Sequence, residues 1–381
     1  MPVPEPQRLL NDLEDLLRQS PELERQLPVR PEEPLPQDCC GQSCEPCVFD
    51  IYRSELDEWS RRCWHRIKCH GEKSENVEDD QKFQPSLFSF QPNTYQTLRL
   101  VSIRPMTTDT NVYRFALPSP NQKLFLPVGT HVIMKGFYET KAPGDDASAG
   151  DSGRIVRAES GNRLVSVVRQ YTPVTAADGV GFMDLMIKLY PFGKMSSHLR
   201  RVQAEMEKGQ EVRVEFRGPY GLYTYAPNRY SDLLMLAAGT GVAPMAQVIE
   251  HVLRDEDVDM TRIRLLFCCR RYEDILLKER FEDWRRRWNF SVCYILSQWR
   301  EETDRKLVKY GEEVLTGTRL EQQHITEEIR RLQRFESAHT STDTGAAPGF
   351  QVLVCGTKSF EKDMMNYLLK AGVVAKRIFR F

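Results

Sequence analysis

The spacing of hydrophobic and polar residues changes once along the chain, close to residue 230. Upstream, from Leu98 to Tyr225, apolar and polar residues alternate in short runs that Gly and Pro interrupt, a pattern typical of antiparallel strands. The strands that this alternation predicts are Tyr113–Leu117, His131–Lys135, Arg163–Val168, Met183–Leu189 and Glu211–Phe216. One segment, Met195–Met206, has the spacing of an amphipathic helix. The pattern therefore predicts a small antiparallel β-barrel closed by one helix.

Downstream of Asp232, continuous apolar runs alternate with segments of helical spacing. The runs predict strands at Leu233–Ala237, Arg262–Cys269, Phe290–Leu296, Gln351–Val354 and Arg377–Phe381. The segments predict helices at Pro244–Asp255, Ile275–Trp288, Thr326–Leu332 and Ser359–Ala371. Residues 333–349 are expected to form a mobile loop. Strands that alternate with helices predict a doubly wound parallel sheet, whose ligand lies at the carboxyl ends of the strands.

Changes in composition divide the chain into five predicted parts. They are an acidic, Pro-rich tail without a fixed fold at 1–38, a Cys-rich module at 39–72, a linker at 73–94, the barrel at 95–226 and the α/β domain at 231–381. Leucines from Leu9 to Leu17 have helical spacing within the tail, which fits either a transient helix or a docking helix. Residues 139–162 are rich in Gly, Asp, Ala and Ser and are expected to form an exposed insertion.

The overall composition narrows the class of protein. The 381 residues are 40% hydrophobic and 28% charged, as in an ordinary globular protein, and the net charge of −1 gives no reason to expect nucleic acid as a partner. No apolar run approaches the ~20 residues that span a bilayer, and no secretory signal peptide is evident. We therefore expect a cytoplasmic monomer whose cysteines are thiols or metal ligands, with any membrane contact made through a partner.

Four cysteines gather near the start of the chain, at Cys39, Cys40, Cys44 and Cys47. Thiolates suit zinc or an iron–sulfur cluster, and the spacing of Cys44 and Cys47 is familiar from such sites. The adjacent Cys39 and Cys40 fit one tetrahedral ion less well, because neighbouring side chains diverge on extended backbone. Reduced thiols, a structural metal and a redox cluster all remain open.

The clearest chemistry lies between residues 169 and 196. Arg169 is a fixed cation that can pair bidentately with a diphosphate, and Tyr171, two residues further along a strand, points the same way. The ring of Tyr171 can stack on a flavin, and Thr172 can hydrogen-bond the flavin ring or ribityl chain. The segment Gly193–Ser196 opens a helix, where main-chain N–H groups and the helix dipole favour phosphate. An aromatic platform between two phosphate-binding devices indicates a flavin diphosphate.

A second candidate site follows the first buried strand of the α/β domain. Gly239-Thr240-Gly241 lies between this strand and a helix, where a dinucleotide binds in doubly wound sheets. The pattern differs from the six-residue glycine fingerprint of the common Rossmann fold, so by itself it indicates a dinucleotide site only weakly. The flavin barrel that precedes it in the chain strengthens this interpretation.

These motifs resemble those of the ferredoxin-reductase superfamily, and most closely the NADH–cytochrome b5 reductases, from Leu98 to Phe381. The segments that carry the resemblance are Arg169–Thr175, Pro191–Ser196, Asp109–Thr110, Phe115–Pro120, Leu126–Gly129, Phe216–Gly221 and Gly239–Met245. The resemblance implies an NADH-dependent, cytochrome b5 reductase-type oxidoreductase with FAD, rather than FMN, in the barrel. Hydride would pass from NADH or NADPH to FAD, and single electrons to cytochrome b5 or another small haem protein. The competing hypothesis is a reductase fold that has lost turnover and acts as a binding or scaffold protein through its Cys-rich module.

The resemblance also implies which residues form the reaction centre. Thr240 would approach both the flavin and the nicotinamide, Cys355 would lie beside the nicotinamide, and Lys188 would lie near the nicotinamide nucleotide. The other cofactor-binding residues that it implies are Arg169, Gln170, Tyr171, Thr172, Pro173, Ile187, Tyr190, Gly193, Lys194, Met195, Ser196, Gly239, Gly241, Pro244, Gly356, Phe360 and Phe381. The segment Pro34–Trp59 resembles a short oxidoreductase-like N-terminal module, a label that establishes no activity.

The choice between the two nucleotides is predicted from the end of one strand. In the related NADH enzymes, the strand equivalent to Phe290–Leu296 ends with an aspartate that repels the 2′-phosphate of NADPH. In this chain Ser297 and Gln298 follow the strand, and Arg270 adds positive charge nearby. We therefore expect relaxed discrimination, with use of both NADH and NADPH.

Overall fold

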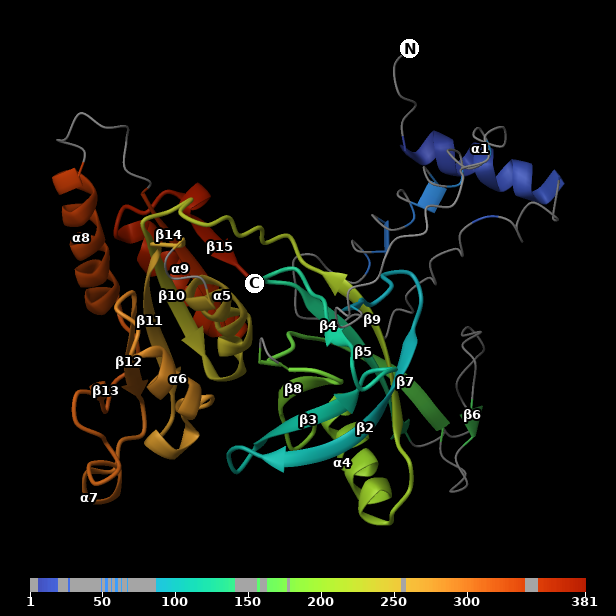
Figure 1. Cartoon of the computed structure of the whole chain (residues 1–381), viewed down its shortest axis with the longest axis horizontal. Helices are drawn as coiled ribbons and strands as arrows, with labels where there is room; N and C mark the ends of the chain where they lie inside the picture. The colour runs from blue at the N-terminus through green and yellow to red at the C-terminus, as the bar shows by residue number, and fades with distance from the viewer. Residues whose placement is uncertain are drawn as a thin grey trace, which may run out of the picture.

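The computed structural model describes residues 6–19, 87–140, 156–157, 163–176, 179–254, 258–339 and 349–381. Between residues 20 and 86 it describes Leu27, Phe49, Tyr52, Arg53, Leu56, Trp59, Ser60, Cys63 and Ile67. Two lobes built on β-sheets lie side by side, and the C-terminus lies between them (Figure 1). None of the described helices combines the length and the apolar character needed to cross a bilayer.

The first lobe is a curled antiparallel sheet of seven strands in the order β6-β7-β5-β9-β2-β3-β8. Its strands are β2 (Gln96–Pro105), β3 (Thr110–Ala116), β5 (His131–Thr140), β6 (Val156–Arg157), β7 (Arg163–Tyr171), β8 (Phe182–Lys188) and β9 (Arg213–Tyr220). A small parallel pair, β1 (Leu87–Phe88) and β4 (Lys123–Leu124), lies beside it. Helix α4 (Lys194–Glu207) buries Met195, Leu199 and Val202 against the interior of the sheet. The predicted antiparallel barrel with one helix is confirmed.

The sheet curls because the chain changes its pairing partner after Tyr171. Tyr171 is still opposite Val132 of β5, whereas Pro173 forms an isolated antiparallel bridge with Leu185 of β8. Val174 N–H then donates to Asp184 O over 2.9 Å. Since β8 is the last strand at the other end of the sheet, this bend brings the two ends of the barrel together.

The second lobe is a parallel sheet of six strands in the order β13-β12-β11-β10-β14-β15. These strands are β10 (Asp232–Ala238), β11 (Arg262–Cys269), β12 (Phe290–Leu296), β13 (Glu313–Thr316), β14 (Phe350–Cys355) and β15 (Ile378–Arg380). The helices are α5 (Val242–Arg254), α6 (Lys278–Trp284), α7 (Glu301–Asp304), α8 (Gln322–His339) and α9 (Lys358–Lys370), with 3₁₀ turns η2 (Gly239–Gly241), η3 (Tyr272–Asp274) and η4 (Ala375–Arg377). The predicted doubly wound sheet is confirmed, and its strand order reverses between β10 and β14, where such sheets bind ligands.

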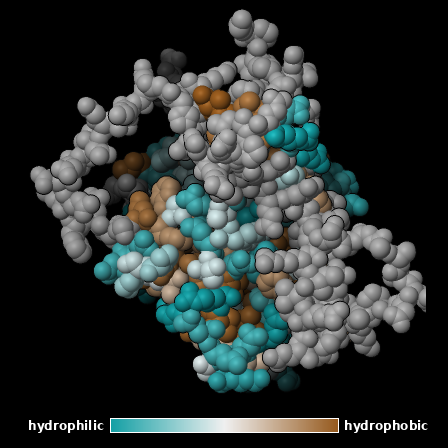
Figure 2. All heavy atoms as spheres, turned by 90° about the vertical axis from the view of Figure 1, so that its right-hand side faces the viewer, coloured by the Kyte–Doolittle hydropathy of each residue, from teal (hydrophilic) through white to brown (hydrophobic). Residues whose placement is uncertain are grey.

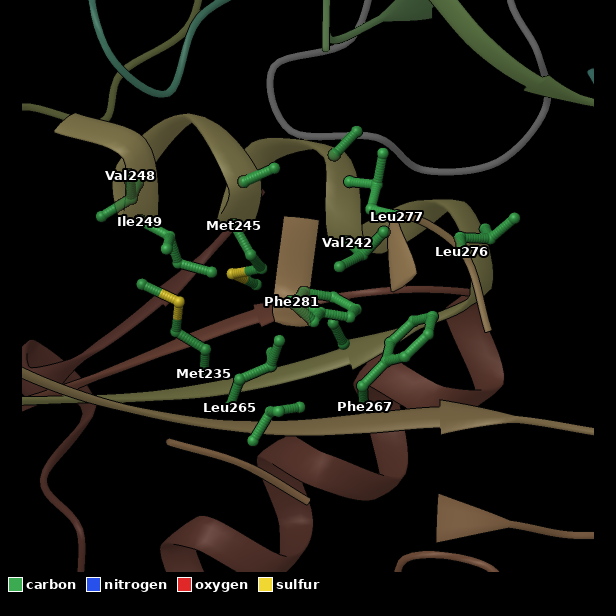
Figure 3. Close-up of a cluster of buried hydrophobic side chains, with 14 of the residues drawn as sticks. Met235, Val242, Met245, Val248, Ile249, Leu265, Phe267, Leu276, Leu277 and Phe281 are labelled. Atoms are coloured by element: carbon green, nitrogen blue, oxygen red, sulfur yellow. The ribbon is translucent and has the colours of Figure 1, made fainter. Parts of the chain in front are cut away.

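Both faces of the parallel sheet are buried, which explains the continuous apolar runs of the sequence. Along β10, Met235 packs in one cluster with α5 and α6, and Leu236 packs in another with α8 and α9. In the first cluster the side chains of Met245 and Ile249 on α5 point toward the strands, and Phe281 of α6 lies among them (Figure 3).

The helix expected at Ile275–Trp288 is shorter in the structure, where α6 spans Lys278–Trp284. Leu277, which precedes it, adopts a left-handed conformation with φ of 55°, so the helix cannot extend toward Ile275. Ile275 remains buried as part of an irregular segment, while Trp288, expected on the apolar face, is 59% exposed.

The helix expected at Thr326–Leu332 is longer than predicted, because α8 continues to His339 and so includes part of the expected loop. Two contacts from residues distant in the chain, one in β11 and one in η4, hold the extension. The Arg262 guanidinium lies 4.9 Å from the centre of the Phe335 ring, and Arg377 forms a two-point ion pair with Glu336. The rest of the expected loop, 340–348, lies outside the described residues.

The N-terminal part contains more structure than the sequence predicts. Helix α1 (Pro6–Gln19) lies in the expected unstructured tail, and its Leu10 and Leu13 pack with Trp59 and Cys63 in a small apolar cluster. The described residues from Phe49 to Ile67 are helical, and Phe49 packs on the barrel. The described surface on this side of the molecule is largely hydrophilic, with smaller hydrophobic areas between (Figure 2).

The Cys-rich motif itself, Cys39, Cys40, Cys44 and Cys47, lies outside the described residues. Within the described part of the chain, no group of three or more His, Cys, Asp or Glu residues is arranged to hold a metal ion. Cys63, the described cysteine that follows this motif in the sequence, has its side chain buried among leucines and Trp59.

Candidate active site

The flavin-binding motif predicted at Arg169–Thr172 occupies the end of β7 and the bend that closes the barrel. Tyr171 packs partly against the barrel interior, and burial raises the pKa of its hydroxyl, which is therefore neutral at physiological pH. The Arg169 Nη1 donates to Val168 O over 2.7 Å, which anchors the guanidinium to its own strand. Tyrosine and arginine on alternate positions thus share the strand end, as predicted.

The second predicted phosphate device is the start of α4. Gly193 is the N-cap residue, and it has no side chain that could accept a hydrogen bond from the first turn of the helix. A Cβ at Gly193 would lie 2.8 Å from the Ser196 Oγ, so a larger residue would crowd the helix start. The Ser196 Oγ accepts from Tyr190 N–H over 2.9 Å and fixes the incoming loop, while the Lys194 Nζ lies 5.2 Å from the centre of the Tyr138 ring. The uncapped N–H groups suit an anion.

Not every predicted cofactor-binding residue presents its side chain at the site. Ile187 and Met195 are buried in the barrel core, and Pro244 is buried within α5. The side chains of these three residues are therefore not available to a cofactor. Tyr190 is 52% exposed, and Gln170 is exposed on β7.

At the switch point of the parallel sheet, η2 lies against the end of β14. A Cβ at Gly241 would lie 2.6 Å from the Cys355 carbonyl carbon, so the two strand ends touch through their main chains. Gly239 has φ of 54°, and a Cβ there would meet nothing within 4 Å, which leaves open space above the turn. Thr240 lies between these glycines, at the mouth of the crevice where a nucleotide binds in such sheets.

Cys355 is partly exposed at the end of β14. Burial, and to a lesser extent the Glu361 carboxylate, raises the pKa of its thiol to about 12. The Glu361 Oε1 in turn accepts from Gly356 N–H over 3.2 Å, and the Phe360 ring packs so closely on Gly356 that a Cβ there would lie 2.6 Å from it. Because the thiol is protonated at neutral pH, Cys355 is suited to contact a ligand rather than to act as a nucleophile.

The two lobes meet along a continuous seam. Val112, Val174 and Met186 of the barrel belong to the same apolar cluster as α5. Gln247 of α5 accepts from Gly129 N–H over 2.9 Å and donates to Pro173 O over 3.0 Å. The seam therefore reaches the residues that follow the flavin-binding motif, and β8 contacts the η2 turn.

An aromatic group closes one end of the seam. The ring centres of Tyr223 and Phe379 are 4.8 Å apart, and those of Tyr223 and Phe381 are 5.2 Å apart. Phe381 N–H donates to Val354 O over 3.1 Å, which fixes the last residue of the chain beside β14. This bond places Phe381, which the resemblance implies as a cofactor-binding residue, next to the switch point.

The predicted nucleotide-selecting residues lie at the ends of β11 and β12. Ser297 N–H donates to Cys269 O over 3.1 Å and Gln298 N–H donates to Arg270 O over 2.7 Å, which places these residues side by side. Arg270 makes ion pairs with Asp109 of the barrel at 2.8 Å and with Asp274 at 3.2 Å.

The sequence alone assigned no role to two residues that organise this seam, Asp109 and Gln247. Asp109 bridges Arg270 to Lys188, with 2.9 Å between its carboxylate and the lysine Nζ. Gln247 is a polar residue on an otherwise apolar helix face, a pattern that signals a specific buried partner. Asp109 belongs to one of the segments that carry the family resemblance, but nothing in that segment indicates a partner in the other domain.

Comparisons with known proteins agree with this geometry. Family models match residues 97–142 and 153–225 as an oxidoreductase FAD-binding domain, 235–366 as an oxidoreductase NAD-binding domain, and 25–66 as the N-terminal part of an oxidoreductase-like protein. An NADH-cytochrome b5 reductase-like protein of Mus musculus is 30% identical over 357 residues, which is 93% of this chain and 96% of that protein. The Homo sapiens protein of the same name is 31% identical over 355 residues, 93% and 95% of the two chains. The chain belongs to the NADH–cytochrome b5 reductase-like family.

Solved structures support the fold of this family member. The cytochrome b5 reductase domain of Ulva prolifera nitrate reductase is 22% identical, covers 77% of this chain and 98% of its own, and gives a TM-score of 0.54. The CS-b5R domains of human Ncb5or in the NAD⁺ form are 20% identical, cover 76% and 69% of the two chains, and give a TM-score of 0.51. This NADH–cytochrome b5 reductase-like chain is therefore an oxidoreductase with an FAD-binding and an NAD-binding domain.

Proposed function

We propose that this chain is an NAD(P)H-dependent flavoprotein reductase that passes electrons to a haem protein, with cytochrome b5 as the acceptor. The observation that carries the proposal is the contact between β8 of the barrel and the Gly239–Gly241 turn at the switch point. Flavin-binding and nicotinamide-binding residues face each other across this contact. FAD, when bound, supplies the chemistry of accepting a hydride and releasing electrons singly.

The residues of the barrel fit a flavin diphosphate. The uncapped first turn of α4 offers main-chain N–H groups, and Arg169 offers a guanidinium from the neighbouring strand end. Tyr171, neutral and partly packed on the barrel interior, supports one face of the flavin ring. Thr172 follows it at the bend, within the same segment.

The residues of the α/β domain fit a nicotinamide nucleotide. The open space above Gly239 admits the pyrophosphate, and Thr240 approaches both ring systems from the turn. The protonated Cys355 supplies a soft, uncharged surface beside the nicotinamide and helps to exclude water. Hydride transfer needs placement and desolvation of the two rings rather than a protein acid or base.

The full-length protein as purified tests this proposal directly. Flavin absorption bands, followed by bleaching when NADH is added without oxygen, are the expected result. A colourless protein that takes up no FAD from solution would overturn the reductase and favour the alternative, a binding or scaffold protein.

We predict that reduction of cytochrome b5 slows as ionic strength rises from low to physiological values. Lys194 is exposed beside the start of α4 and, with Lys188, can attract the acidic surface that surrounds the haem edge of such a partner. Electrostatic steering raises association rates and weakens with salt. Initial rates at sub-saturating cytochrome b5 measure the effect, with ferricyanide at saturating concentration as the control. A rate that does not change with salt, or no reduction, would indicate a different acceptor.

The strand ends support use of both nucleotides. Ser297 and Gln298 provide no carboxylate against a 2′-phosphate, and Arg270 lies next to them. The nearby Glu301 accepts hydrogen bonds from Trp299 Nε1 over 2.6 Å and from Arg305 Nη1 over 2.6 Å, and the arginine partly neutralises its charge.

We predict that Gln298→Asp shifts the ratio of kcat/KM toward NADH by about ten-fold, because a carboxylate placed here repels the 2′-phosphate. Steady-state kinetics with both nucleotides measure the ratio. Gln298→Asn, which has the shape of aspartate without its charge, is the matched control and should leave the ratio close to that of the wild type. If the aspartate variant behaves in the same way, the ribose does not lie at this strand end.

A further inference from the structure

Asp109 lies in the turn between β2 and β3 and is held in one orientation. Thr107 Oγ1 and Thr110 Oγ1 both donate to its Oδ1, over 3.2 Å and 3.1 Å. The turn itself is closed by hydrogen bonds from Met106 N–H and Thr107 N–H to Thr110 O. These bonds direct the other carboxylate oxygen, Oδ2, toward the α/β domain.

The Oδ2 of Asp109 joins two cations from different domains. Lys188 Nζ, at the end of β8, lies 2.9 Å away, and Arg270 Nη2, at the end of β11, lies 2.8 Å away. Both cations are residues for which the preceding sections propose nucleotide contacts. Asp109 therefore engages both charged groups that a nucleotide phosphate would use, and it shares Arg270 with Asp274, which lies 3.2 Å from the guanidinium.

The carboxylate is ionised and its ion pairs are accessible to water. Burial opposes ionisation of Asp109, but the hydrogen bond and charge of Lys188, with the charge of Arg270, outweigh burial and lower its pKa. The side chains of Asp109 and Arg270 are 26% and 45% exposed. Partly exposed ion pairs are individually weak, so a phosphate dianion can displace Asp109 from Arg270.

We propose that Asp109 is a positioning residue that sets the preference between NADH and NADPH by competing with the 2′-phosphate for Arg270. NADPH must separate Arg270 from Asp109 before its 2′-phosphate can use the guanidinium, whereas NADH has no such group to place there. This inference rests on the proposed function, in which Arg270 and Ser297 face the adenosine ribose. Competition by Asp109 would give selectivity against NADPH although no acidic residue follows β12 at Ser297 and Gln298.

The test is Asp109→Asn, which keeps an acceptor for Thr107 and Thr110 but removes the charge. We expect the KM for NADPH to fall about five-fold, the size of effect typical of releasing one partly exposed ion pair. The KM for NADH should change by less than about two-fold, and kcat should be unchanged with either nucleotide. Steady-state kinetics with saturating ferricyanide measure these values, and inhibition by 2′-phospho-AMP compared with AMP gives the same ratio without turnover.

Two further variants separate this role from a structural one. On an Arg270→Gln background, Asp109→Asn should no longer change the ratio of the KM values for NADPH and NADH, because the cation for which Asp109 and the 2′-phosphate compete is gone. Glu215→Gln removes a carboxylate that pairs with Lys135 at 3.7 Å within the barrel sheet, and it should leave the ratio as in the wild type. Asp109→Ser is a second charge-removing variant should the asparagine variant fold poorly, with the same expected outcomes.

Equal changes in both KM values, or no change, in a variant that retains its flavin would overturn the role of Asp109. That failure differs from a failure of the proposed function, in which the wild-type protein itself would bind no flavin or would not be reduced by either nucleotide.

Discussion

Replacing Arg169 with alanine should yield protein that is largely free of flavin. The guanidinium stands beside Tyr171 at the end of β7, where a charge-assisted bidentate contact with a diphosphate contributes about 1.5–3 kcal/mol. Its loss therefore corresponds to a ten- to hundred-fold lower affinity for FAD, taking about 1.4 kcal/mol for each factor of ten. The ratio of flavin to protein absorbance reports the content of purified protein, and titration of the flavin-free variant with FAD gives the affinity.

Two variants sharpen this measurement. Arg99→Ala removes an exposed arginine from β2 of the same barrel and should retain flavin, which controls for loss of a surface charge. Arg169→Lys keeps the charge without the planar fork, so it should recover only part of the affinity. Full flavin content in Arg169→Ala would show that the diphosphate binds elsewhere.

The parallel sheet was the easiest part of the fold to predict. The observed bounds of β11, Arg262–Cys269, and β12, Phe290–Leu296, equal those expected from their apolar runs. Strands buried on both faces are largely apolar, so their extent can be read from composition despite the arginines at the start of β11. The curl of the barrel was predictable as a fold class, but the bend after Tyr171 that produces it depends on pairing with β8 and leaves no mark in local composition.

The errors in the helices have non-local causes. Helix α6 begins late because Leu277 takes a left-handed conformation, which a leucine does not signal in the sequence. Helix α8 extends because Arg262 of β11 and Arg377 of η4, both distant in the chain, contact its last turns. In the N-terminal tail, α1 forms around Leu13 because Trp59 and Cys63 cover that side chain. Tertiary contacts decided these segments, and helix propensity did not.

The residues of the candidate site likewise fall into those that local sequence reveals and those that depend on distant contacts. Arg169 with Tyr171, and the glycines of η2, were predictable because each device is complete within a few consecutive residues. Asp109 was not, because its partner Arg270 is 161 residues away and belongs to the other domain. A residue whose role is to join two domains has no local pattern that would reveal it.

The Gly239–Gly241 turn is the part of the proposed site most sensitive to a single methyl group. A Cβ at Gly241 would come within 2.6 Å of the Cys355 carbonyl carbon and closer still to its oxygen, and both are main-chain atoms that cannot turn aside. Gly241→Ala must therefore move η2 away from β14. A displacement of about 1 Å in a catalytic arrangement costs on the order of 100-fold in rate, so we expect kcat/KM for NADH and NADPH to fall by that factor.

Flavin content of Gly241→Ala should remain that of the wild type, because Arg169 and the start of α4 lie in the other domain. Anaerobic stopped-flow reduction of the bound flavin by NADH isolates the affected step from electron transfer to the acceptor. Gly209→Ala is the control for a glycine replacement that causes no steric clash: its φ of 77° strains an alanine, a strain that Gly241 does not share, but a Cβ there would meet nothing within 4 Å, so it should cost stability without changing the reduction rate. Reduction of Gly241→Ala at the wild-type rate would mean that the nicotinamide does not bind at the switch point. The contact between β8 and this turn would then no longer support the proposed function.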